Sequence, residues 1–259
     1  AQNIPDTPDE AFVTDFSRPG TTRVDEAFDE VTWRAGVEYD LSQDVMTYFT
    51  WSTGFLSGAL SANGTVTDQQ ESEAFEFGVK GRFLNGRLTA NLAAYYNEFT
   101  NLATQIQNTL PSGTGVTDTI NGGEIEASGL EFETALLVGD SFTITFNSSY
   151  MDAEYGTFGS SNPFQLVNGQ RQAFVDLEGE TPPWSPEFTA TLMGSYSISL
   201  GNYGTLTPSI NSYYTDGYSV NGFNLPDIPG SVQDSYTKTD FRIGWQSLSE
   251  KFHVEAFVE

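Results

Sequence analysis

Residues 75–99 read FEFGVKGRFLNGRLTANLAAYYNEF, two alternating runs joined by Asn85-Gly86. In the first run, Phe75, Phe77 and Val79 alternate with polar or small residues, and the second run repeats the alternation around Leu92. Because successive side chains of a strand point to opposite faces, each run predicts a strand with one apolar and one polar face. Asn-Gly between two such runs is the strongest short-range hairpin signal. The stretch therefore predicts a β-hairpin.

The same alternation recurs along the rest of the chain. It predicts about ten strands, at residues 33–40, 45–55, 75–83, 87–99, 130–138, 141–151, 188–200, 205–218, 240–246 and 252–258. No segment shows the period of an amphipathic helix, and no apolar run approaches the roughly 18 residues that a membrane-crossing helix needs. We therefore expect an all-β protein.

The connections between these segments alternate between short and long. The short ones are Asp40–Asp44, Asn85-Gly86, Gly139-Asp140, Gly201–Gly204 and Ser247–Glu250, and the long ones cover residues 56–72, 101–124, 156–185 and 219–235. Compact soluble domains rarely contain several connections of this length, whereas an outer-membrane barrel has short periplasmic turns and long extracellular loops. Aromatic residues gather near both ends of the strands, as membrane–water interfaces favour. The sequence predicts a transmembrane antiparallel up-and-down β-barrel.

The composition excludes several classes of function. The 259 residues include 35 Asp and Glu against 10 Lys and Arg, for a formal net charge of −25, with one histidine and no cysteine. Without cysteine, there can be no disulfide, thiolate metal site or cysteine nucleophile. A chain this acidic offers no basic surface to a phosphate backbone, so nucleic acid is not an expected partner. Hydrolase and dinucleotide motifs are also missing, so we expect no enzyme activity, no catalytic residue and no cofactor.

Acidic residues are concentrated in residues 1–30, which we expect to form an extracellular loop segment ahead of a barrel portion at 31–259. Calcium binding by this segment is an alternative, because hard oxygen ligands suit calcium. No EF-hand spacing supports it, and no metal-ligating residue is assigned. The single histidine, His253, lies on the polar parity beside a short turn, where a solvated position is expected.

Two other architectures remain open on the residues alone. A soluble β-sandwich binding module also alternates, but it would pack Phe77, Leu92, Ile144 and Leu192 against one another in a dry interior between two sheets. A small passive barrel, or porin, would have to close on itself, because a lipid-facing sheet cannot leave its edges unpaired in hydrocarbon.

Several segments resemble the barrel of TonB-dependent outer-membrane receptors. They are the hairpin at 75–99, Asn121-Gly122-Gly123 followed by Ser128–Glu133, Trp51–Phe55, Pro186-Glu187 and Val254–Val258. The resemblance covers about residues 31–259. It implies a barrel of about 22 strands around an N-terminal plug, of which this chain would be the C-terminal portion, without the plug and the last strand.

The same resemblance implies a function and partners. Members take up a scarce nutrient, such as a ferric siderophore, cobalamin, haem or an oligosaccharide, with energy delivered through TonB. The expected location is the outer membrane of a Gram-negative bacterium. The expected partners are outer-membrane lipid, the small-molecule nutrient, and the TonB complex, which the absent N-terminal part would contact.

Ligand recognition in such a barrel would involve lumen-facing residues near the long loops. Strand parity predicts that the following residues face the lumen there, which makes them candidate ligand-binding residues: Tyr95, Asn97, Phe99, Asn211 and Tyr213. Aromatic faces and amides suit sugars and chelates alike. The negative charge of the chain repels an anionic ligand at long range, which favours either a neutral or sugar-like ligand or a salty habitat in which screening shortens the range of the repulsion.

Overall fold

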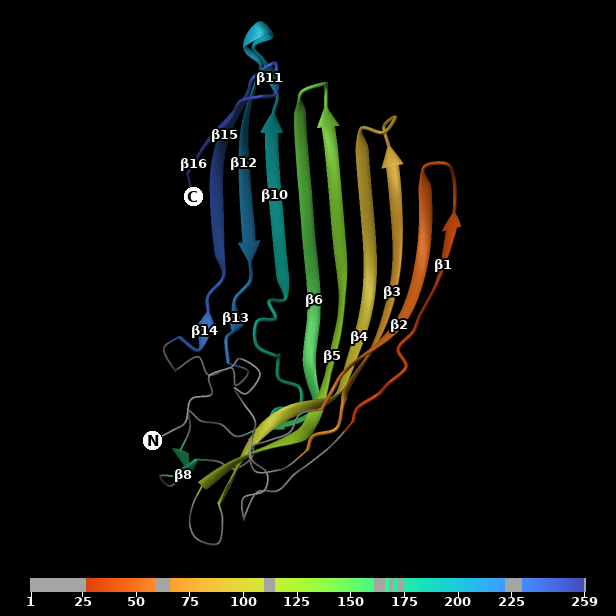
Figure 1. Ribbon diagram of the computed structural model, residues 1–259, viewed down its shortest axis with the longest axis vertical. Helices are drawn as coiled ribbons and strands as arrows, with labels where there is room; N and C mark the ends of the chain where they lie inside the picture. The colour runs from red at the N-terminus through yellow and green to blue at the C-terminus, as the bar shows by residue number, and fades with distance from the viewer. Residues whose placement is uncertain are drawn as a thin grey trace, which may run out of the picture.

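The computed structural model describes residues 27–58, 66–109, 115–160, 166–167, 170–171, 175–221 and 230–258. Ten strands follow one another along one antiparallel sheet (Figure 1). In order across the sheet they are β1 (Arg34–Asp40), β2 (Val45–Leu56), β3 (Gln70–Phe83), β4 (Leu88–Thr109), β5 (Gly115–Val138), β6 (Phe142–Ser160), β10 (Phe188–Tyr196), β12 (Thr205–Thr215), β15 (Tyr236–Gln246) and β16 (His253–Val258). Each strand pairs with its neighbours in this order, which confirms the predicted all-β, up-and-down arrangement.

Six shorter strands either pair with strands of this sheet or form separate ribbons. β9 (Val175–Asp176) pairs with β6, and β11 (Ile198–Ser199) pairs with β12. Two separate ribbons are formed by β7 (Leu166–Val167) with β8 (Gln170–Arg171), and by β13 (Tyr218–Ser219) with β14 (Val232–Gln233). The described residues include no helix with the length and hydrophobicity needed to cross a membrane.

The strands meet short turns at one end of the sheet, here called the turn end, and long connections at the other, the loop end (Figure 1). The predicted Asn-Gly hairpin joins β3 to β4. Asn85 and Gly86 have φ angles of 56° and 81°, and the Gly86 N–H donates to the Phe83 carbonyl at 3.1 Å. Positive φ at both positions is what a tight hairpin requires, and Asn and Gly tolerate it best.

One predicted long loop is largely strand. The sequence indicates a connection at 101–124, yet β4 continues to Thr109 and β5 begins at Gly115. The alternation is lost there because the pairing shifts register between Phe99 and Ala103 and again between Gly123 and Ile125. A bulge moves side chains to the opposite face, so a period of two no longer runs through it.

The cross-strand register collects the apolar side chains on one face of the sheet, the apolar face, and the charged and amide side chains on the other, the polar face. Phe77, Leu92 and Leu192 belong to the apolar face and are 52%, 50% and 51% exposed. Among the described residues only Ala153, Tyr155 and Leu177 are buried hydrophobic side chains. A β-sandwich would bury the apolar face against a second sheet, so that architecture is wrong for this chain.

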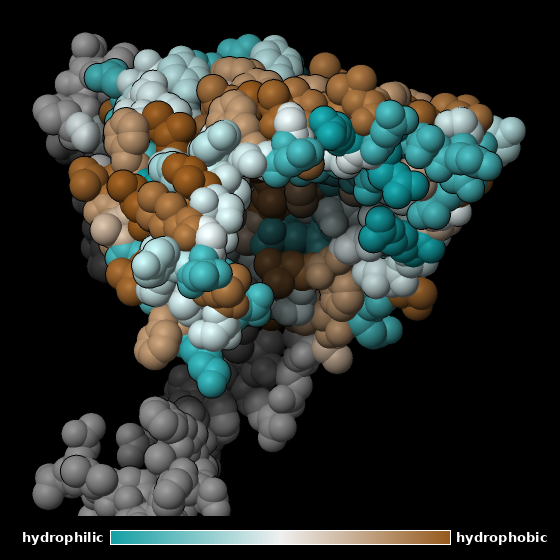
Figure 2. Space-filling view, turned by 90° about the horizontal axis from the view of Figure 1, so that it is seen from above, coloured by the Kyte–Doolittle hydropathy of each residue, from teal (hydrophilic) through white to brown (hydrophobic). Residues whose placement is uncertain are grey.

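The sheet curves, and Figure 2 shows its wall around a hollow, with hydrophobic residues along much of its outer side. The wall is open in the described residues, because β1 pairs only with β2 and β16 only with β15. A closed ten-stranded barrel is therefore not the arrangement seen.

Aromatic residues of the apolar face form a band near the loop end. Trp51, Phe75 and Tyr96 lie in register across β2, β3 and β4. The polar tips in this band bond to carboxylates further towards the loops: Trp51 Nε1 donates to Glu73 Oε1 at 2.6 Å, and the Tyr214 hydroxyl to Asp216 Oδ1 at 2.6 Å. Apolar ring bodies with polar tips turned to one side are typical of a membrane–water boundary.

Candidate functional site

All five residues nominated from the sequence lie on the polar face. Tyr95 is in register with Glu76, Asn97 with Ala74, and Phe99 with Ser72. Asn211 and Tyr213 lie on β12, and three strands, β5, β6 and β10, separate them from β4. Four strand spacings of about 4.8 Å place the two groups roughly 19 Å apart along the sheet. The structure therefore divides the candidates into a β4 patch and a β12 patch.

In the β4 patch, Tyr95 lies against the wall. A Cβ added at Gly129, its register partner on β5, would lie 2.5 Å from the Tyr95 hydroxyl, so the ring covers this glycine. Tyr95 thus packs against β5, which leaves its other ring face as the part open to a ligand.

Asn97 and Phe99 extend the β4 patch towards the loop end. Asn97 is flanked in register by Ala74 on β3 and Ala127 on β5, so its amide stands above two methyl side chains. Phe99 is 38% exposed. An amide and a half-exposed ring on a floor of small residues can bind a ligand through hydrogen bonds and ring contact together.

An aromatic pair that the sequence analysis missed lies on β6 at the same end. The Tyr155 and Phe158 rings stack with centroids 4.2 Å apart, and Tyr155 is only 7% exposed. The Gly179 N–H donates to the Tyr155 carbonyl at 2.8 Å, and nearby Leu177 is 5% exposed. The pair was missed because residues from 156 onwards were expected to be loop.

The β12 patch includes partners from β15. The Tyr213 and Tyr236 rings are 6.1 Å apart, and Lys238 is the register partner of Tyr213. Lys238 Nζ lies 3.7 Å from Asp240 Oδ1. Two phenol groups beside an ammonium group can donate several hydrogen bonds to the oxygen atoms of one ligand.

The aromatic surface continues beyond this patch through Tyr218. Tyr218 follows the end of β12 by three residues, and its ring centroid lies 5.5 Å from that of Trp184. Trp184 is 65% exposed, and its φ of 62° is unusual for a residue with a side chain. Its N–H donates to the Ser219 carbonyl at 2.8 Å, which holds this conformation. Strained, exposed residues of this kind are found more often at ligand sites than elsewhere.

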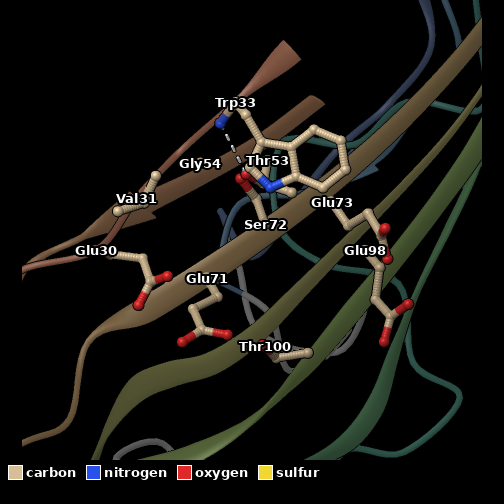
Figure 3. A pocket seen from close by; sticks show the side chains of 10 residues that line it. All are labelled: Glu30, Val31, Trp33, Thr53, Gly54, Glu71, Ser72, Glu73, Glu98 and Thr100. Atoms are coloured by element: carbon tan, nitrogen blue, oxygen red, sulfur yellow. Dashed lines mark hydrogen bonds between the residues drawn. The ribbon is translucent and has the colours of Figure 1, made fainter. Parts of the chain in front are cut away.

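A cavity of about 340 Å³ at the loop ends of β1 to β4 includes none of the five candidates. Its walls carry Trp33 and the carboxylates of Glu30, Glu71, Glu73 and Glu98 (Figure 3). Glu71 and Glu73 share the strand parity of Phe75, so they lie on the apolar-face side rather than towards the hollow. This position and its negative charge make the cavity a poor candidate for an anionic ligand.

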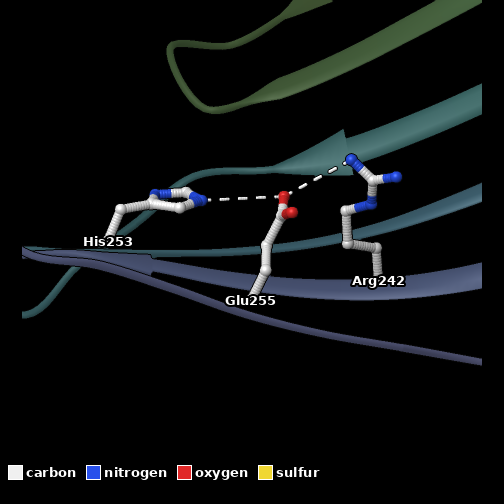
Figure 4. A network of polar contacts seen from close by, with 3 residues as sticks. All are labelled: Arg242, His253 and Glu255. Carbon is white, nitrogen blue, oxygen red and sulfur yellow. Dashed lines mark hydrogen bonds and ion pairs between the residues drawn. The ribbon is translucent and has the colours of Figure 1, made fainter.

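A second cavity, of about 320 Å³, lies on the polar face at the turn end. Figure 4 shows Arg242 and His253 directed to one carboxylate, with Arg242 Nη1 3.4 Å and His253 Nε2 3.7 Å from Glu255 Oε1. The His253 side chain is 59% exposed, in agreement with the solvated position predicted.

No group of three or more histidine, aspartate or glutamate residues within the described ranges could hold a metal ion. The acidic segment proposed for calcium lies mostly outside them, since residues 1–26 are not described.

Comparisons with known proteins agree on one family. The sequence pattern of the family described as "TonB dependent receptor-like, beta-barrel" matches residues 8–258. The ferrichrome outer membrane transporter and phage receptor of Escherichia coli (strain K12) is 28% identical over 242 residues, which are 91% of this chain and 29% of that protein. The probable TonB-dependent siderophore receptor PiuA of Acinetobacter baumannii is 24% identical, over 86% of this chain and 30% of that protein. The chain thus spans about three tenths of the length of these curated relatives.

The fold is also that of solved structures. The crystal structure of the ferric yersiniabactin uptake receptor FyuA from Yersinia pestis superimposes with a TM-score of 0.62 at 18% identity, covering 86% of this chain and 31% of that one. At this level of identity the likeness establishes the fold alone.

Proposed function

The chain belongs to the TonB-dependent receptor β-barrel family and lies in the bacterial outer membrane, and on this premise we propose that it forms part of the wall of a receptor that imports a ferric siderophore. The observation that supports this most is the two-sided wall. Its apolar face carries an aromatic band as a lipid-facing surface does, and its polar face surrounds a hollow that would be the lumen (Figure 2).

The siderophore class is favoured by the relatives. One is named as a ferrichrome transporter, one as a siderophore receptor, and a protein of the same fold as a ferric yersiniabactin uptake receptor. Cobalamin, haem and oligosaccharides, which the sequence also allowed, are not in these names. In this proposal the chain supplies binding and passage rather than a chemical step, and energy from TonB reaches the receptor through a part outside this chain.

We assign ligand contact to both patches of the polar face. The β4 patch would contribute the Asn97 amide and the Phe99 ring. The β12 patch would contribute Tyr213, Tyr236 and the Lys238 ammonium group, whose donors suit the oxygen atoms that surround ferric iron in a chelate. Contacts from two sides of a wide lumen would hold a bulky chelate better than either patch alone.

The test is uptake of ⁵⁵Fe by cells that carry the full-length receptor in place of their own siderophore receptors, with ferrichrome and ferric yersiniabactin as probes. We expect saturable uptake of at least one chelate that stops when TonB is deleted. Tyr213→Ala and Asn97→Ala should each weaken binding about tenfold, as truncation of a contact residue commonly does. Thr191→Ala is the control, because Thr191 lies on the polar face in register with Tyr213 and belongs to neither patch. Uptake that persists without TonB, or a receptor present in the membrane that takes up neither chelate, would count against the proposal.

A further inference from the structure

Asn121-Gly122-Gly123, one of the segments noted in the sequence, lies where β4 and β5 change direction. The two strands pair continuously from Leu88 to Phe99, shift register, and pair again from Ala103 to Thr109. Asn101, at the shift, has a φ of 57°. In Figure 1 the loop-end parts of both strands turn away from the direction of the sheet and run across the view below the ends of β6 and β10. These parts, residues 102–109 and 115–123, are called the arm.

The Asn121 side chain ties three segments together at this point. Its Nδ2 donates to the Asn101 carbonyl at 2.8 Å and to the Asp68 carbonyl at 3.1 Å. Its Oδ1 accepts from the Asp68 N–H at 2.7 Å. An amide is the side chain that offers two donors and an acceptor together, so neither aspartate nor alanine can replace all three bonds.

The two glycines allow close packing on either side of Asn121. A Cβ at Gly122 would lie 2.1 Å from Thr104 Cγ2, and a Cβ at Gly123 would lie 2.2 Å from Phe158 Cδ2 and 2.5 Å from the Thr157 carbonyl. Phe158 is itself stacked on Tyr155. The arm is thereby packed against β6, and Thr104 is 6% exposed.

From this geometry we infer that Asn121-Gly122-Gly123 is a rigid joint that fixes the arm across the loop end of the lumen, and that Asn121 is a positioning residue for ligand entry. The joint lies directly beyond Phe99 on β4, so the direction of the arm determines which molecules reach the β4 patch. The reference to a ligand rests on the proposed function, but the position of the arm does not. Release of the arm should widen access to the β4 patch for large molecules and leave access for small ones unchanged.

The arm's position can be measured without a ligand. This chain has no cysteine, so spin labels can be placed at Ala103→Cys on the arm and Asn202→Cys in a turn at the opposite end, both exposed, in a full-length receptor from which any cysteine outside this chain has been removed. We expect a narrow distance distribution that broadens in Asn121→Ala. Asn91→Ala is the matched control, because Asn91 makes one bond across the same strand pair, from Nδ2 to Glu133 Oε2 at 3.3 Å. An unchanged distribution in Asn121→Ala, or equal broadening in the control, would overturn the inference.

Access of molecules to the β4 patch is measured on whole cells as the rate at which Asn97→Cys is labelled. One reagent is a small maleimide, and the other is a maleimide linked to polyethylene glycol. Asn121→Ala should raise the labelling rate of the large reagent about three- to tenfold, which is the change in an equilibrium expected from loss of a typical hydrogen bond, and leave the labelling rate of the small reagent unaffected. If Asn121→Ala does not reach the membrane folded, Asn121→Asp, which keeps the bond from the Asp68 N–H, takes its place. Failure of both variants to fold would assign Asn121 to barrel assembly and overturn the inference. A receptor that passes these tests but imports no siderophore would refute the proposed function alone.

Discussion

The substitution Leu192→Arg tests which face of the wall contacts lipid. Leu192 is the fifth of nine residues in β10 and lies on the apolar face between Phe188 and Tyr196. Four residues of about 3.4 Å separate it from either aromatic residue, which is about 10 Å of depth for a strand tilted by about 40°. Because the apolar band of such barrels is about 25 Å tall, Leu192 lies close to its middle.

The expected loss of folding free energy follows from the depth of Leu192 in the membrane. Arginine on the lipid face near the midplane costs about 2–4 kcal/mol, which lowers the folding equilibrium roughly 30- to 900-fold. Thr191→Arg is the matched control, because Thr191 is the adjacent residue on the opposite face, in register with Asn147 and Tyr213. Its guanidinium group would reach water in the lumen, so a change of less than about 1 kcal/mol is expected.

The free energy of folding is measured by urea titration of the full-length receptor in lipid vesicles, with the shift in gel mobility between folded and heated protein as the signal. Leu192→Arg should lower the urea midpoint far more than Thr191→Arg does. A larger effect of Thr191→Arg would mean that the polar face meets lipid, and equal effects would mean that neither side chain is in hydrocarbon. Either result would refute the assignment of faces on which the binding patches depend.

The faces could be predicted from sequence because they depend only on parity. In the ten long strands most hydrophobic side chains fall on one parity, and the pairing then places these parities on a common face. The Asn85-Gly86 turn was predictable for the same reason, since its signal is local.

Neighbours across the sheet could not be predicted, because parity fixes a face and not a lateral position. Tyr48 covers Gly78, and Tyr95 covers Gly129, only because register places each ring opposite a glycine. In the same way, the nominated residues fall into two patches because three strands intervene, and Lys238 joins the β12 patch through its pairing with Tyr213.

The position of the arm could not be predicted from the sequence, for another physical reason. Its hydrogen bonds run from a side chain to backbone atoms of two distant segments, and the spacing between Asp68 and Asn121 carries no periodic signal. Trp184 was likewise not singled out, because its conformation depends on the Ser219 carbonyl on β13.

Three further substitutions separate packing from charge: Gly129→Ala and Arg242→Ala on the polar face, and Gly194→Ala on the apolar face as a packing control. Gly129→Ala should destabilise the folded receptor by about 1–3 kcal/mol in the same urea titration, because the new Cβ would lie 2.4 Å from the Tyr150 carbonyl as well as against Tyr95. Gly194→Ala, whose Cβ would meet no atom closer than 3.6 Å, should change stability by less than about 0.5 kcal/mol, and equal effects of the two would contradict the packing argument. Arg242→Ala removes a 3.4 Å ion pair to Glu255 in which the side chains are 58% and 39% exposed. Because water screens such a pair, its loss should cost less than about 1 kcal/mol and shrink further in high salt. A loss comparable to that of Gly129→Ala would mean that Arg242 is a buried contact to a part of the receptor outside this chain.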